Sequence, residues 1–212
     1  MEEGYPGKVE FSVKFTLIDT KLIIDYSAKT DKDTIINLTN HSYFSLDNSG
    51  NIYDTYIKIN ADSYCKTDEQ SIPTGELKSL DNTDMDLRSF VKFGDIINSS
   101  YSDIAFTGGI DHSYVLSDKL QNDLTLFAEA KSEHSGLHLL CYTTLPGVQL
   151  YTSNGLDEKN GKCGAVYKKH SAFCLETQNY PDAINHPNFP SPILKPNEEY
   201  KTTTVYQVVL DK

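Results

Sequence analysis

The stretch VEFSVKFTL, residues 9–17, decides the fold class. Every second residue from Val9 to Leu17 is apolar, and the residues between them are polar or charged. Successive side chains of a β-strand point to opposite faces, so this pattern predicts a strand with one buried face and one wet face. The run KLIIDYSA, residues 21–28, predicts its antiparallel partner, joined through a turn at residues 18–21.

Further short runs along the chain are rich in β-branched and aromatic residues and are separated by Gly, Asn, Asp and Pro, which is typical of strands and turns. No window shows a convincing helical stripe, and the best helical candidate, Leu87–Ile97, is interrupted by Gly94. The sequence therefore predicts one all-β, antiparallel domain over residues 1–212, a large sandwich or barrel. The further strands are predicted at residues 34–38, 53–59, 124–130, 137–143, 148–152 and 203–210.

The composition argues against several classes of partner. The chain has 212 residues, a formal net charge of -11 and no basic run, so it is a poor partner for nucleic acid or an anionic membrane surface. The first residues lack a signal peptide, and no apolar stretch approaches the ~20 residues of a membrane span, so we expect a cytoplasmic protein. The four cysteines form no CxxC pair and are expected to be reduced thiols.

Glu176 is the candidate general base. It follows the apolar run AFCL, residues 172–175, which should be buried, so its carboxylate should lose solvation and its pKa should rise. A carboxylate with a raised pKa is a competent general base near neutral pH. The alternative is a structural glutamate that accepts hydrogen bonds from the backbone or from Gln178, and this segment alone favours that alternative.

His41 is the matching candidate for a general acid, because an imidazole titrates near physiological pH. The alternative is a histidine that anchors the turn before Tyr43, and the spacing alone favours it. Asp111 and Gln149 can exchange hydrogen bonds with the hydroxyl groups of a sugar, although Asp111 could equally cap the turn at residues 108–109.

Other functional motifs fail on geometry or are missing. His134 and His138 have the spacing of a helical metal pair, but four residues of a strand span roughly 13 Å. The sequence contains no Gly-rich phosphate loop, GxSxG elbow or Cys–His nucleophile pattern. We therefore expect no metal site.

Four segments, in their order along the chain, resemble the aldose 1-epimerase (galactose mutarotase) family. They are NLTNHSYFSL (37–46), the GIDH step (109–112), PGVQLYTSN (146–154) and CLETQNYPDAINHPNFPSPIL (174–194). The resemblance runs from Gly4 to Tyr206. It implies an antiparallel β-supersandwich that interconverts the α and β anomers of aldoses such as galactose and glucose, without a cofactor or metal.

The same resemblance implies a role for each candidate residue. Glu176 would be the general base on the anomeric hydroxyl, and His41 the general acid on the ring oxygen. Asp111 and Gln149 would bind sugar hydroxyls. An acid and a base with separated protonation preferences can open and reclose the sugar ring together.

One departure from the family lies upstream of the GYPG turn at residues 4–7. Members of the family carry an N-terminal section there, with a GRxANRI-like and an NxLHGG-like segment at the sugar site. Neither segment occurs in this chain, and its one arginine, Arg88, has a different context. We therefore expect a chain that is incomplete at the N-terminus, with exposed sheet edges and a sugar site that lacks an arginine and a histidine.

Three hypotheses stay open on the sequence alone. The chain is an epimerase homologue that keeps the acid–base pair and has impaired activity, a non-catalytic carbohydrate-binding or partner-binding remnant, or a truncated product without independent function.

Overall fold

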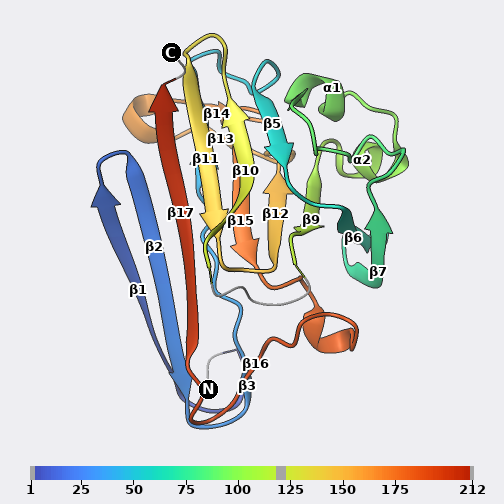
Figure 1. The fold of residues 1–212 in the computed structure, drawn as a ribbon. Helices are drawn as coiled ribbons and strands as arrows, with labels where there is room; N and C mark the ends of the chain where they lie inside the picture. The colour runs from blue at the N-terminus through green and yellow to red at the C-terminus, as the bar shows by residue number, and fades with distance from the viewer. Residues whose placement is uncertain (1–2, 118–122, 211–212) are drawn as a thin grey trace.

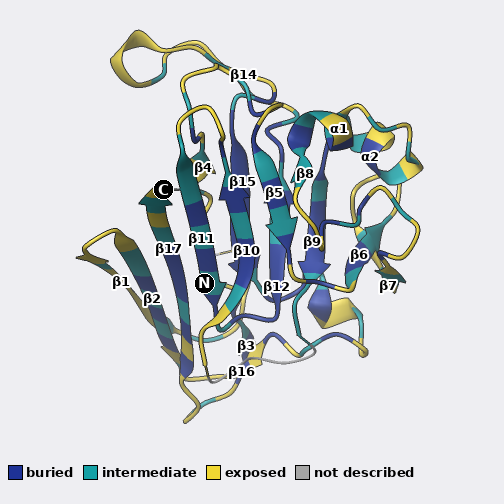
Figure 2. Ribbon diagram, turned by 45° about the horizontal axis from the view of Figure 1, so that its top comes forward, coloured by how far each residue is buried: buried dark blue, intermediate teal, exposed yellow. Residues whose placement is uncertain are grey.

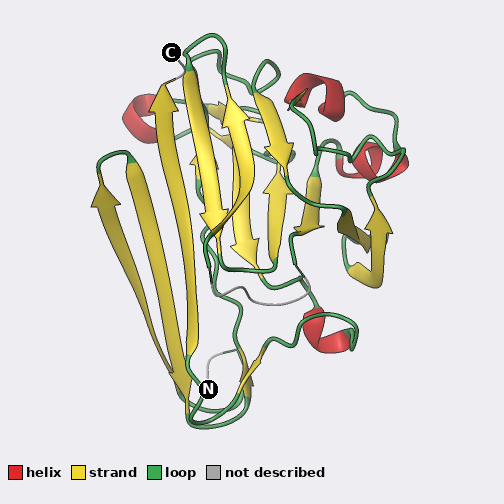
Figure 3. Ribbon diagram, viewed as in Figure 1, coloured by secondary structure: helices red, strands yellow, loops and turns green. Residues whose placement is uncertain are grey.

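A computed structural model describes residues 3–117 and 123–210, so the ends of the predicted domain, residues 1 and 212, lie outside the described residues. Most of the regular structure is antiparallel β-sheet (Figure 3), and the predicted all-β sandwich is confirmed. In the described part of the chain, the first sheet has the strand order β1-β2-β17-β11-β10-β5-β8. Its strands are β1 (Val9–Ile18), β2 (Lys21–Thr30), β17 (Tyr200–Leu210), β11 (Leu137–Thr143), β10 (Thr125–Lys131), β5 (Tyr56–Ile59) and β8 (Val91–Lys92).

The second sheet has the order β4-β15-β12-β9-β6-β7. Its strands are β4 (Tyr43–Phe44), β15 (Phe173–Gln178), β12 (Gly147–Tyr151), β9 (Asp111–Val115), β6 (Ser63–Thr67) and β7 (Pro73–Ser79). Figure 1 shows the helices α1 and α2 at the end of the molecule opposite β1 and β2. The remaining elements are the strand pairs β13 (Asp157–Glu158) with β14 (Tyr167–Lys168) and β16 (Ile193–Leu194) with β3 (Thr34–Ile35), and the helices α1 (Phe93–Ile97), α2 (Ser102–Thr107), η1 (Lys162–Gly164) and η2 (Ala183–Asn185).

The core lies between the two sheets and fixes which side chains face away from it. From the second sheet, Leu150 of β12 and both Phe173 and Leu175 of β15 join this core and are at most 1% exposed. Each such side chain stabilises the fold by about 1.5–3 kcal/mol relative to leaving it in water. Because side chains alternate along a strand, Cys174 and Glu176 of β15 must point to the other face of the sheet.

Strand β1 is formed as predicted, but its apolar side chains are not buried. Phe11, Phe15 and Leu17 are 64%, 64% and 75% exposed. They lie opposite core-facing residues of β2, but β1 is the edge of the first sheet and the second sheet ends at β4. Figure 2 shows β1 exposed at one side of the molecule. The expectation of one buried face is therefore wrong for this strand, because no layer of the described residues covers it.

The weak helical candidate at 87–97 contains strand β8 and the five-residue helix α1, which begins at Phe93. One expected strand needs correction. The strand expected at 34–38 is reduced to the two residues of β3, which pair with β16. No helix of the described residues has the length and hydropathy needed to cross a membrane.

Candidate active site

A row of polar side chains crosses the outer face of the second sheet. Strand β12 pairs with β15 on one side and with β9 on the other, and Gln149 lies opposite both Glu176 and Ser113. Residues directly opposite one another in antiparallel strands share a face and have adjacent side chains. The row therefore runs Ser113, Gln149, Glu176, and the register of three strands fixes it.

A second row lies beside the first. Tyr151 of β12 is opposite Cys174 of β15 and opposite Asp111 of β9. Each member of this row is two residues from a member of the first row, which is the repeat that keeps side chains on one face of a strand. Asp111 is thereby brought beside Gln149, and Gln149 Nε2 donates a hydrogen bond of 2.7 Å to Asp111 Oδ1.

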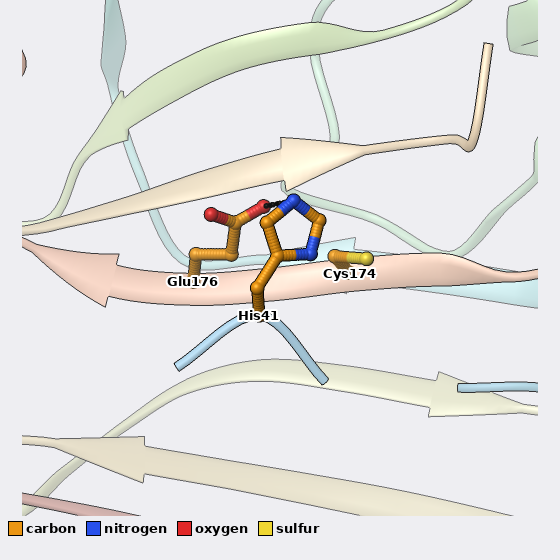
Figure 4. Close-up of side chains that lie close together, drawn as sticks. All are labelled: His41, Cys174 and Glu176. Carbon is orange, nitrogen blue, oxygen red and sulfur yellow. Dashed lines mark ion pairs between the residues drawn. The ribbon is translucent and has the colours of Figure 1, made fainter. Parts of the chain in front are cut away.

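His41 reaches this face from a distant part of the chain. It lies outside regular structure, two residues before Tyr43, and β4 pairs Tyr43 with Cys174 of β15. Its imidazole stacks on the Tyr43 ring with 5.0 Å between centroids. Its Nε2 is 3.3 Å from Glu176 Oε1 (Figure 4). The structure thus brings the candidate acid and the candidate base into contact.

All members of the two rows except Cys174 line a cavity of about 440 Å³, which is within the usual range for small-molecule sites. All four residues singled out from the sequence line it. Its ionisable side chains include two carboxylates and the His41 imidazole, and the described lining residues contain no lysine or arginine. The lining residues are His41, Tyr43, Cys65, Thr67, Ser71, Pro73, Asp111, Ser113, Gln149, Tyr151, Glu176, Gln178 and Pro181.

The acid and base candidates differ in their exposure. The Glu176 side chain is 11% exposed, whereas that of His41 is 51% exposed and forms part of the cavity rim. Burial raises the pKa of Glu176, the Asp111 carboxylate raises it further, and the His41 imidazole opposes the rise. This is the direction expected from the sequence, and it suits a carboxylate that accepts a proton near neutral pH.

Two buried polar atoms on the cavity floor lack hydrogen-bond partners among the described residues, namely Gln149 Oε1 and Ser113 Oγ. The Ser113 hydroxyl lies near the Cys65 thiol and slightly favours its thiolate, but burial dominates and raises the pKa of Cys65 to about 12. A buried polar atom without a partner costs about 1–3 kcal/mol. A ligand rich in hydroxyl groups can recover this cost by bonding to both atoms.

Reasoning from the sequence missed several of the lining residues. Ser113 and Tyr151 were not singled out for the site, although each lies two residues from a residue that was, Asp111 and Gln149 respectively. The strand repeat was the signal that could have found them. The turn-capping alternative for Asp111 receives no support, because its Oδ1 accepts from the Gln149 side chain instead.

Comparisons with known proteins identify the family. The aldose 1-epimerase family model matches residues 1–207. The galactose mutarotases of Sus scrofa and Homo sapiens are 45% and 46% identical to the chain over 206 and 209 residues, which is 96% and 97% of this chain and 58% and 59% of theirs. The aldose 1-epimerase of Escherichia coli K12 is 34% identical over 217 residues, 99% of this chain and 61% of the relative.

Solved structures show the same relationship. The GalM/aldose epimerase homologue from C. elegans superposes with a TM-score of 0.88 at 29% identity, covering 100% of this chain and 63% of that one. The galactose 1-epimerase from Lactobacillus acidophilus NCFM gives a TM-score of 0.81 at 26% identity, covering 98% and 59%. The chain spans about three fifths of the length of these relatives. Because the family model spans residues 1–207 and the mammalian relatives are 45% and 46% identical to it, the chain belongs to the aldose 1-epimerase family.

Proposed function

We propose that this protein interconverts the α and β anomers of a neutral hexose, such as galactose or glucose, by acid–base opening and closure of the ring. The observation that carries the proposal is the 3.3 Å contact between His41 Nε2 and Glu176 Oε1 in a cavity of about 440 Å³. The two oxygens that exchange protons in this reaction, O1 and O5, are bonded to the same carbon. An acid and a base that serve them must therefore lie close together, as these two side chains do.

The proton transfers balance within the pair. The Glu176 carboxylate removes the proton from O1, the O1–C1 bond becomes a carbonyl and the C1–O5 bond breaks. The protonated His41 imidazole gives its proton to O5, so the ring opens to a neutral aldehyde. Rotation about C1–C2 presents the other face of the carbonyl, and the reverse transfers close the ring and restore both side chains.

The cavity floor supplies the polar contacts that would orient the sugar. Asp111 accepts hydrogen bonds, and Gln149 Oε1 and Ser113 Oγ are buried without partners among the described residues. The two carboxylates of the site favour an uncharged polyol over a sugar phosphate, because like charges repel in a site with few compensating groups. The names of the relatives, galactose mutarotase and aldose 1-epimerase, support the same substrate class. The cytoplasmic location and the domain bounds stay predictions.

Mutarotation of freshly dissolved α-galactose, followed by polarimetry or by NMR exchange, tests the proposal on the full chain. General acid–base catalysis contributes about 10²–10⁴-fold, so Glu176→Gln should reduce the rate to that of buffer. The matched control is Glu133→Gln, which removes the same charge from an exposed glutamate and should leave the rate unchanged. Full activity in Glu176→Gln would exclude Glu176 as the base, and a folded parent chain no faster than buffer would refute the activity itself.

A further inference from the structure

We propose that His41, Cys174 and Glu176 form a binding site for a soft or borderline divalent cation such as Zn²⁺, and that a cation bound there inhibits the protein. One imidazole nitrogen, the thiol sulfur and one carboxylate oxygen all lie within 4.8 Å of one another. Figure 4 shows the His41 imidazole between the Glu176 carboxylate and the Cys174 sulfur. The three side chains therefore converge beside the cavity, which His41 and Glu176 also line.

The donor set matches the chemistry of zinc. Imidazole nitrogen, thiolate sulfur and carboxylate oxygen are its usual ligands, with bonds of about 2.0–2.3 Å, and tetrahedral bonds of that length separate ligand atoms by about 3.5 Å. His41 Nε2 and Glu176 Oε1 are 3.3 Å apart, which is close to this separation. Since no pair of the three ligand atoms exceeds 4.8 Å, the sulfur needs to move by only roughly 1 Å.

Strand β15 fixes the positions of two of the metal-binding side chains, whereas the third, His41, is free to reorient. Cys174 and Glu176 are two residues apart on β15, so the strand repeat fixes them on one face. The His41 side chain is 51% exposed, and it can turn aside to admit a cation to the buried thiol. Three protein ligands leave a fourth position that opens into the cavity, where water can complete the coordination.

The electrostatics of the cavity favour a cation. Asp111 and Glu176 contribute two carboxylates, and no lysine or arginine occurs among the described residues that line it. The chain as a whole carries a formal net charge of -11, which raises the local concentration of divalent cations.

Binding exchanges a proton for the metal. Burial, Glu176 and Asp111 all raise the pKa of Cys174, so the unliganded site holds a neutral thiol. On binding, the Sγ–H bond is replaced by an Sγ–metal bond, the proton passes to solvent, and the cation gives up part of its bound water. The ion then occupies the proposed general acid and general base, so the cation and the sugar should compete.

Cd²⁺ is the probe of choice, because its bond to a thiolate gives an ultraviolet charge-transfer band. The full chain is used with Cys163→Ser, which removes the exposed thiol. We expect one equivalent of Cd²⁺ to bind and produce the band, and Cys174→Ser to abolish it. Cys65→Ser is the matched control, since Cys65 is likewise a buried cysteine and lines the neighbouring cavity, but lies outside the cluster. His41→Gln and Glu176→Gln should each weaken binding at least tenfold.

A band that is absent from the parent, that persists in Cys174→Ser, or that disappears equally in Cys65→Ser overturns the proposal. Circular dichroism of Cys174→Ser and of Cys174→Ala shows whether a lost band reflects lost folding, and either folded variant suffices for the test. The readout does not depend on mutarotation. If Cd²⁺ binds as expected but the chain does not accelerate mutarotation, the metal site stands and the proposed activity fails.

Discussion

The hydrogen bond from Gln149 Nε2 to Asp111 Oδ1, 2.7 Å long, determines which way the Gln149 amide points. A carboxylate can only accept, so the amide nitrogen must face Asp111 and the amide oxygen must face away from it. That oxygen is buried and has no hydrogen-bond partner among the described residues. If the cavity binds a sugar as proposed, Asp111 would act on it in two ways, as an acceptor itself and as the group that orients Gln149 as a second acceptor.

Asp111→Ala should therefore weaken sugar binding by more than the loss of a single hydrogen bond would. A hydrogen bond to a charged group contributes about 1.5–3 kcal/mol, so we expect KM for galactose to rise at least tenfold. Asp157→Ala is the control, because Asp157 is an exposed carboxylate of the β13–β14 hairpin. Steady-state mutarotation rates at varied galactose measure the effect, and an unchanged KM in Asp111→Ala would remove Asp111 from the sugar site.

His41→Asn should slow turnover sharply, because the ring oxygen then leaves without a proton donor. The expected loss in kcat is about 10²-fold or more, the usual contribution of a general acid. The exposed His134 provides the matched control, His134→Asn, which should turn over at the parental rate. The rates are measured by polarimetry at saturating sugar, and a kcat for His41→Asn within twofold of the parent would contradict the role.

The pKa of Glu176 should move in opposite directions in two variants. Asp111 raises this pKa and His41 lowers it, so Asp111→Asn should lower it and His41→Gln should raise it. A general base is active above its pKa and is lost as the pH falls through it, so the acidic limb of kcat/KM should shift the same way. The carboxyl ¹³C resonance of Glu176, identified by its absence in Glu176→Gln, reports the pKa directly. Shifts in one common direction would show that these two charges do not control the carboxylate.

Some strands could be predicted from the sequence and others could not. The hairpin of β1 and β2 follows from alternating residues, and Leu137–Thr143, a run rich in strand-forming residues, was predicted residue for residue. In β15 the first five residues are all buried, because the core covers one face and the cavity residues crowd the other. Alternation therefore disappears from the very strand that carries Glu176.

The sequence could identify the residues of the candidate site, but not the strand pairing that brings them together. His41 lies outside regular structure, and it reaches Glu176 because the two-residue strand β4 pairs with β15 across a long separation in sequence. A strand of only two residues is too short to show a periodic pattern in the sequence. The approach of Cys174 to His41 depends on the same pairing.

Phe173→Ala should be strongly destabilising, because Phe173 anchors β15 from the core side. Its ring is fully buried and lies 5.0 Å from Phe93 and 5.8 Å from Phe44, measured between centroids. Removing a buried phenylalanine costs about 3–5 kcal/mol, so the urea midpoint should fall markedly. Phe106→Ala is the control, since Phe106 is 53% exposed. Equal midpoints for the two variants would show that β15 is not held by this contact.

Ser113→Ala should move stability and sugar binding in opposite directions. The Ser113 hydroxyl is buried on the cavity floor, with no hydrogen-bond partner of ordinary geometry among the described residues. Its desolvation is a cost that the folded protein bears, so an alanine at that position should leave the free energy of unfolding unchanged or raise it by up to about 1 kcal/mol. The same change removes a possible hydrogen-bond partner for a sugar hydroxyl, so KM for galactose should rise several-fold while kcat changes little.

Urea unfolding and mutarotation kinetics on the same preparation separate the two effects. If Ser113→Ala destabilises the protein by more than 1 kcal/mol, the hydroxyl is satisfied within the fold. If KM stays constant, it does not contact the sugar.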